Sequence, residues 1–119
     1  MKKFLFTLTA VAGAILSAAA AGVPTFPGGD AALKKYISDN TVYPENAKEN
    51  GVEGIVSVGF IVNTDGSLSQ IKVIKLIDPD LEKEAIRVVG IMPAWIPAEK
   101  DGTPIEAPSK VDIPFILDE

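Results

Sequence analysis

Apolar and polar residues alternate with a period of two in three segments, which is the pattern of strands buried on one face. In residues 54–62 the apolar side chains of one face are Val56, Val58, Phe60 and Val62. The same period predicts strands at 68–77 and 111–117. Residues 63–66 read Asn-Thr-Asp-Gly, a turn signal. The first two strands are therefore expected to form an antiparallel hairpin.

A period of three to four residues predicts helices in three other places. The first helix follows Asp30, which can act as its N-cap, and it ends at Asn40. A second, short helix begins at Pro44, since proline suits the first helical position. The third and longest begins at Pro79 and stops before Pro93, because a proline ring cannot continue a helix.

The order of these elements predicts an α+β fold. We expect a three-stranded antiparallel sheet with strand order second, first, last, and the long helix packed on one face. The polar residues 99–104 are interpreted as a loop. The last strand lies at an edge, and Pro114 within it agrees, because proline lacks the donor that a central strand needs. Pro114 has two readings, as part of a docking edge or only as protection against unwanted strand pairing.

The first 21 residues have the composition of an export signal. Lys2 and Lys3 are followed by an uncharged apolar stretch, which ends in the small residues 17–21. Cleavage after Ala20 or Ala21 is the favoured interpretation, and an uncleaved inner-membrane anchor is the alternative. We therefore expect a periplasmic protein with a signal peptide at 1–21.

Charge and composition exclude several classes of function. Without Lys2 and Lys3, 9 basic residues stand against 16 acidic ones, a formal charge of −7, which does not attract nucleic acid or anionic lipid. The chain contains no histidine and no cysteine, so the commonest general base and the thiol nucleophile are missing. Carboxylates paired in sequence, such as Asp78 with Asp80, are better explained as helix-capping or solvated residues. We expect no enzyme activity and no cofactor or metal.

Four motifs in fixed order resemble the C-terminal domain family of TonB, the periplasmic energy transducer. The motifs are Tyr43-Pro44 with Ala47, Gly51 and Gly54; the hairpin around Asp65-Gly66; Asp78-Pro79-x-Leu81 leading to Ala85; and Met92-Pro93-x-Trp95-x-Pro97 with Gly102 and Pro104. Together they cover residues 40–117. The leader and helix at 22–42 resemble short-chain members from Bacteroidetes-type bacteria, and residues 43–119 correspond to the TonB-like domain. In this family the tryptophan packs over the end of the core, so Trp95 is interpreted as structural.

The resemblance implies recognition by strand addition. The last strand of such domains pairs with a short peptide, the TonB box, of an outer-membrane receptor in TonB-dependent transport. The implied partner-binding residues are Val111, Asp112, Ile113, Pro114, Phe115, Ile116 and Leu117, with Asn40 as a further polar contact. We expect the amide donors of Ile113 and Phe115 to serve a guest strand if they face away from the first strand.

Several alternatives stay open beside this interpretation. An inner-membrane energising complex is a second candidate partner, and the chain is either a monomer or an edge-paired dimer. Residues 22–42 are too short to link the two membranes, since about 20 residues extend ~70 Å at most. The same fold could instead serve as a periplasmic interaction domain in signalling or envelope assembly.

Overall fold

A computed structural model describes residues 22–75 and 77–117 of the chain. The predicted signal peptide at 1–21 lies outside the described residues. The elements are α2 (Gly29–Asn40), α3 (Glu45–Glu49), β2 (Gly54–Val62), β3 (Leu68–Val73), α4 (Pro79–Gly90), β4 (Ala98–Lys100), β5 (Thr103–Ile105) and β6 (Ala107–Phe115).

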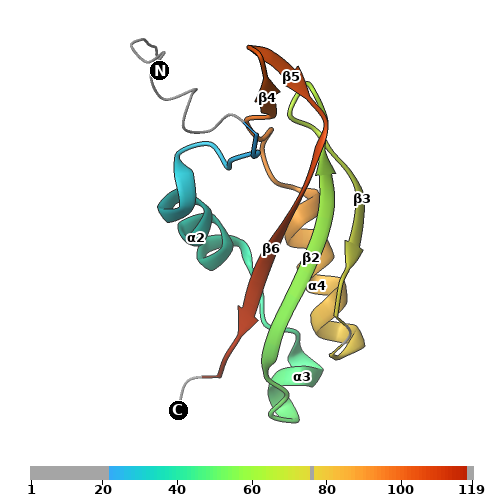
Figure 1. Ribbon diagram of the computed structural model, residues 1–119. Helices are drawn as coiled ribbons and strands as arrows, with labels where there is room; N and C mark the ends of the chain where they lie inside the picture. The colour runs from blue at the N-terminus through green and yellow to red at the C-terminus, as the bar shows by residue number, and fades with distance from the viewer. Residues whose placement is uncertain (1–21, 76, 118–119) are drawn as a thin grey trace.

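The predicted α+β fold and its strand order are confirmed. The main sheet has the order β3-β2-β6, and β2 pairs antiparallel with both neighbours. Helix α4 covers one face of this sheet, and α2 lies beside β6 on the side away from β2 (Figure 1). The core contains the predicted face of β2 and the apolar side of α4, whose fully buried members are Val56, Val58, Val62, Leu81, Ala85, Val88 and Val89.

Trp95 packs at one end of this core, as predicted. Its side chain is 5% exposed. The indole meets the rings of Phe26 and Phe60 edge-on, at centroid distances of 5.7 and 5.1 Å. Its backbone N–H donates to the carbonyl of Gly66 at 2.9 Å. Gly66 has φ +88°, and a Cβ there would lie 2.2 Å from the Trp95 carbonyl oxygen, so this contact requires glycine.

The strand boundaries differ from the sequence prediction in two places. β3 ends at Val73, and the predicted extension to residue 77 is wrong. Ile74 donates the last bond, to the carbonyl of Ser57 at 2.8 Å, before the chain turns towards α4. β6 runs from Ala107 to Phe115 rather than over 111–117. Its first half pairs with the end of β2, Val62 opposite Ala107, but lacks the large apolar residues that would have revealed it.

The predicted loop at 99–104 is instead a small hairpin. β4 and β5 pair around Asp101 and Gly102, which both have positive φ, 54° and 80°. An Asp-Gly pair is a hairpin signal in itself. The flanking strands have three residues each and no clear alternation of polarity, so the periodicity missed them.

The helix starts also differ in detail. Asp78 caps α4 as predicted, since its carboxylate accepts the N–H groups of Asp80 and Leu81 at 3.0 and 3.1 Å. Helix α2 begins two residues earlier than expected: Gly28 is its N-cap, in the left-handed conformation, and Asp30 lies within the first turn. Pro44 is the N-cap of α3 rather than its first residue.

Candidate functional site

The outer edge of β6 is the predicted docking surface, and the strand register shows which of its backbone groups are available. In a strand, the N–H and C=O of one residue point to the same side, and successive residues alternate. Ile74 donates to Ser57, so Ser57 faces β3, and its neighbours Val56 and Val58 face β6. Their partners in β6 are Ile113 and Val111.

Asp112 and Pro114 therefore direct their backbone groups away from β2, towards the free edge. The same alternation directs the backbone groups of Lys110 to the outer side. It also directs those of Ile116 outward, although Ile116 lies just beyond the end of the strand. Leu117 supports this assignment, because its N–H points inward and donates to the Glu53 carboxylate at 2.6 Å. Ile113 and Phe115 were expected to serve a guest only if their donors face away from the first strand, and this condition is not met, because both face β2.

Side chains alternate in the same way across the sheet. Those of Val111, Ile113 and Phe115 are buried in the core, whereas those of Asp112, Pro114 and Ile116 are exposed. Ile116 is 67% exposed. Of the predicted partner-binding residues at 111–117, Asp112, Pro114 and Ile116 thus combine an outward backbone with an exposed side chain.

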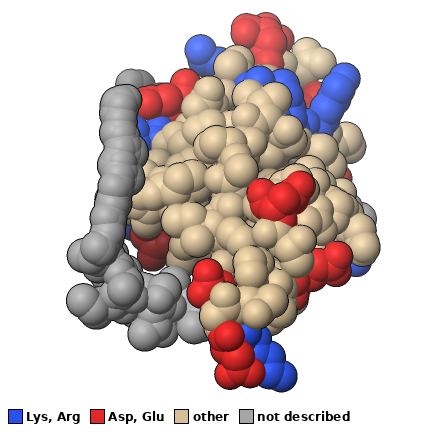
Figure 2. All heavy atoms as spheres, turned by 90° about the horizontal axis from the view of Figure 1, so that it is seen from above, with Lys and Arg blue, Asp and Glu red and all other residues tan. Residues whose placement is uncertain are grey.

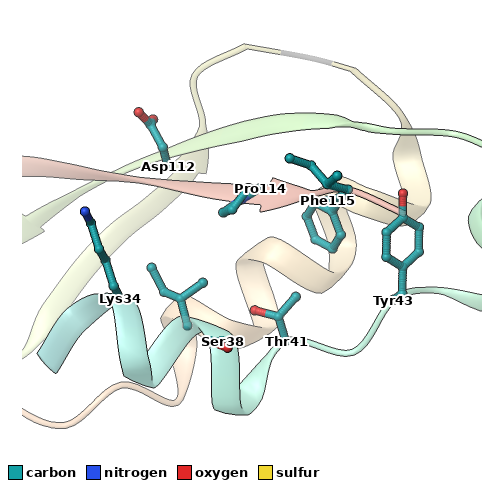
Figure 3. A pocket seen from close by; sticks show the side chains of 9 residues that line it. Lys34, Ser38, Thr41, Tyr43, Asp112, Pro114 and Phe115 are labelled. Carbon is teal, nitrogen blue, oxygen red and sulfur yellow. The ribbon is translucent and has the colours of Figure 1, made fainter. Parts of the chain in front are cut away.

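A groove of about 540 Å³ runs along this edge, between β6 and helix α2. We call it the edge groove. Its lining residues are Lys34, Ile37, Ser38, Thr41 and Tyr43 on one side and Asp112, Pro114, Phe115 and Ile116 on the other. Figure 3 shows the two walls facing each other, with Lys34 near the Asp112 end and Tyr43 near the Phe115 end. The α2 wall was not predicted, because the apolar stripe of this helix indicated only a core face.

The two ends of the edge groove differ in chemistry. At one end the Asp112 carboxylate accepts the Ser57 hydroxyl at 2.7 Å and lies 3.9 Å from the Lys110 ammonium. At the other end Tyr43 meets the Phe115 ring edge-on at 5.6 Å, and its hydroxyl donates to the Val52 carbonyl. Desolvation raises the pKa of the Tyr43 hydroxyl, and the negative charge of Glu53 raises it further.

Helix α2 is held against α4 by polar contacts at its C-terminal end. The Tyr36 hydroxyl donates to the Val88 carbonyl at 3.0 Å, and the Arg87 guanidinium donates to the Asn40 carbonyl at 2.7 Å. The Glu84 carboxylate accepts the Val42 N–H at 2.7 Å. Its hydrogen bond with Arg87 is the main reason why the pKa of Glu84 lies below its usual range.

Asn40 does not line the edge groove. Its side-chain amide donates to the Tyr36 carbonyl at 2.8 Å, and its own carbonyl is the acceptor for Arg87. Its place is at the joint between α2 and the rest of the fold. A contact between Asn40 and a partner stays a prediction.

The described residues also bear on two other classes of site. Among residues 22–75 and 77–117, no three His, Cys, Asp or Glu side chains are grouped so that they could hold a metal ion. None of the helices in that part of the chain has the length and apolar character needed to cross a membrane. On the face shown in Figure 2, acidic and basic side chains lie interspersed, mostly around the rim, rather than in one basic patch.

Comparison with known proteins assigns the family. Residues 39–117 match the family described as Gram-negative bacterial TonB protein C-terminal. The chain belongs to this family.

Individual relatives agree with this assignment. Protein TonB of Helicobacter pylori is 43% identical over 53 residues, which cover 44% of this chain and 19% of that protein. Protein TonB of Haemophilus influenzae is 40% identical over 74 residues, covering 56% and 27%. The solution structure of the H. pylori TonB C-terminal domain superposes with a TM-score of 0.55 at 31% identity, over 72% of this chain and 78% of that one. The chain thus spans a small part of the length of its full-length relatives.

Proposed function

We propose that this chain is a non-catalytic periplasmic binding protein of the TonB type. Its partner is a short N-terminal peptide, the TonB box, of an outer-membrane receptor, and its task lies in TonB-dependent transport. The peptide binds by adding a strand to the free edge of β6. The proposal is supported by the family and by the backbone geometry of that edge.

The observation that carries the proposal is the outward direction of alternate backbone groups along β6. An added strand binds through main-chain hydrogen bonds, which supply affinity, and through alternate side chains, which supply selectivity. Asp112 and Ile116 each offer a donor and an acceptor at this edge, and Pro114 between them offers only an acceptor. A guest strand can therefore pair on both sides of Pro114 and loses one bond opposite it.

The position of Pro114 also limits indiscriminate pairing. Long edge strands with every donor free invite aggregation, and a proline at an outward position interrupts such an edge. Pro114 can therefore both belong to a docking edge and protect against unwanted strand pairing. One missing donor lowers the affinity for any strand, but a strand with matching side chains can still bind.

A role as an interaction domain in signalling or envelope assembly is the second candidate. It is favoured by the packing of the leader: the Gly22 N–H donates to the Glu99 carbonyl at 3.1 Å, and Phe26 and Ile37 are buried. Residues 22–42 are folded onto the domain and do not form an extended linker. The docking edge would be the same, but the partner would not be a transport receptor.

A pair of proline substitutions tests the docking edge. Ile116→Pro removes an outward donor, so it should weaken binding of a synthetic receptor N-terminal peptide. The expected loss is about 2- to 12-fold, equivalent to one hydrogen bond of about 0.5–1.5 kcal/mol. Leu117→Pro is the control, since it removes the inward donor that Glu53 accepts. The control should lower the melting temperature and leave affinity unchanged.

Isothermal titration calorimetry with peptides from the receptors of the same organism gives the affinities, and thermal melts give the stabilities. Equal affinity of the wild type and Ile116→Pro would show that the guest does not pair with this edge. Absence of binding for every receptor peptide at millimolar concentration would remove the transport role and leave the interaction-domain role.

A further inference from the structure

We infer that helix α2 is the second wall of the docking site and selects the partner peptide by its side chains. The partner class is an extended peptide with an acidic side chain and an aliphatic side chain two residues apart, both pointing at α2. This inference rests on the proposed docking at β6 and adds a specificity surface to it.

The dimensions of the edge groove fit a short extended segment. From Asp112 to Ile116 is four strand steps, or about 13 Å. From Lys34 to Asn40, the last residue of α2, is six helical steps, or about 9 Å. Side chains on one face of a strand repeat every second residue, about 6.6 Å. The groove therefore accepts two helix-facing side chains of a guest.

The alternation of side chains fixes what those two residues meet. A strand added to β6 continues the sheet, so its residues point alternately to the open face and to the core face. On the open face they lie beside Asp112, Pro114 and Ile116, which are exposed. The guest side chains on the core face point into the space between β6 and α2, where residues of both walls line the groove.

The chemistry of the wall differs along α2. Lys34 stands at the Asp112 end of the groove (Figure 3), and it forms no salt bridge within 4.0 Å among the described residues. An acidic guest residue there would gain an ion pair. Towards the other end, Ile37 is 8% exposed and Phe115 is 1% exposed, so an aliphatic guest residue would extend the core. Open-face guest residues should not be acidic, because they lie beside the Asp112 carboxylate.

The α2 wall is already in place before a partner binds. Tyr36 ties the helix to α4, Phe26 packs against both Tyr36 and Trp95, and Arg87 holds the C-terminal end at Asn40. A wall fixed in this way reduces the ordering cost of binding. The helical part of this wall, Lys34, Ile37 and Ser38, precedes residue 39, where the family match begins, so that part lies outside the matched region.

The test uses protein expressed from the full-length sequence and a phage-displayed library of random decapeptides. Peptides are selected on the wild type, sequenced and resynthesised. Their affinities are then measured for the wild type and for Ser38→Trp, which fills the groove from an exposed position on its wall. Asp39→Trp is the matched control, because Asp39 is also exposed, is the next residue along α2, and does not line the groove.

We expect the selected peptides to share an acidic and an aliphatic residue two positions apart. Ser38→Trp should weaken them about tenfold or more, and Asp39→Trp should stay within about twofold of the wild type. Lys34→Glu should reverse the preference at the acidic position in favour of lysine.

Equal affinity for the wild type and Ser38→Trp would overturn the α2 wall and leave docking at β6 intact. A consensus without the period-two pattern, no binding peptide at all, or an unchanged preference in Lys34→Glu would also overturn it. Selected peptides that respond to Ser38→Trp as expected support the groove even if receptor peptides fail to bind, in which case only the transport role is lost.

Discussion

Replacement of Trp95 by alanine should be among the most damaging single changes to this fold. The indole is 5% exposed and meets Phe26 and Phe60 edge-on. Through Phe26 it also anchors the leader and α2, since Phe26 contacts Tyr36 at 5.5 Å. The variant therefore removes the side chain that joins the N-terminal segment to the end of the core.

The magnitude follows from three terms. A side chain of this size buries about 150–250 Å², which at roughly 25 cal/mol per Å² is worth about 4–6 kcal/mol. The two edge-on ring pairs add about 1–3 kcal/mol. The indole N–H is buried without an acceptor among the described residues, which costs about 1–3 kcal/mol. This cost cancels the gain from the two ring pairs. Because alanine keeps the Cβ, the net loss should be about 3–5 kcal/mol, the range of large aromatic deletions.

Thermal unfolding followed by circular dichroism measures this loss. For a domain of this size each 1 kcal/mol shifts the melting temperature by about 4–8 °C, so Trp95→Ala should lower it by at least about 12 °C. Trp95→Phe should cost much less, because it keeps the ring contacts and removes the unpaired donor. A melting temperature within about 4 °C of the wild type, together with lost peptide binding, would instead make Trp95 a recognition residue.

Three further predictions concern a turn, an ion pair and processing. Gly66→Ala should destabilise the protein by about 2 kcal/mol more than Gly102→Ala in urea unfolding, since both have positive φ but only at Gly66 would a Cβ strike a carbonyl oxygen; equal costs would contradict the contact. Glu84→Gln should cost about 1–2 kcal/mol at neutral pH. The pKa of Glu84 is lower in the folded protein than in the unfolded chain, so its contribution to stability is complete above the unfolded-state pKa and is lost as the pH falls through the folded-state pKa. The stability difference between variant and wild type should therefore disappear in strong acid. A difference that is independent of pH would refute this. Intact mass of periplasmic protein should show a mature chain beginning at or next to Gly22, and recovery from the inner membrane starting at Met1 would favour the anchored alternative.

The large apolar residues made most of the fold predictable. Val56, Val58, Phe60 and Val62 alternate without interruption, and Asp78 with Pro79 marks the start of α4, so the sheet, the long helix and the edge position of β6 followed from local rules. Short elements with few large apolar residues were missed. β4 and β5 have three residues each, and the first half of β6 contains proline, serine and lysine.

The candidate site was predictable on one side only. Pro114 pointed to an edge strand, but the direction of each N–H depends on the register between β2 and β6, and a sequence does not contain that register. The prediction therefore left open which way the N–H groups of Ile113 and Phe115 point. Lys34 and Ser38 come close to β6 only because Phe26, Tyr36 and Arg87 hold α2 against the rest of the fold, which is a tertiary arrangement.

The most direct test of the docking edge is a two-dimensional NMR titration of isotope-labelled protein with a receptor N-terminal peptide. Strand addition at β6 predicts that the amide signals of 110–117 move, with the largest shifts at Asp112 and Ile116, whose N–H groups point outward. The inward-facing amides of Ile113 and Phe115 should move less. Shifts that cluster instead on β3, at the opposite edge of the sheet, would contradict the account.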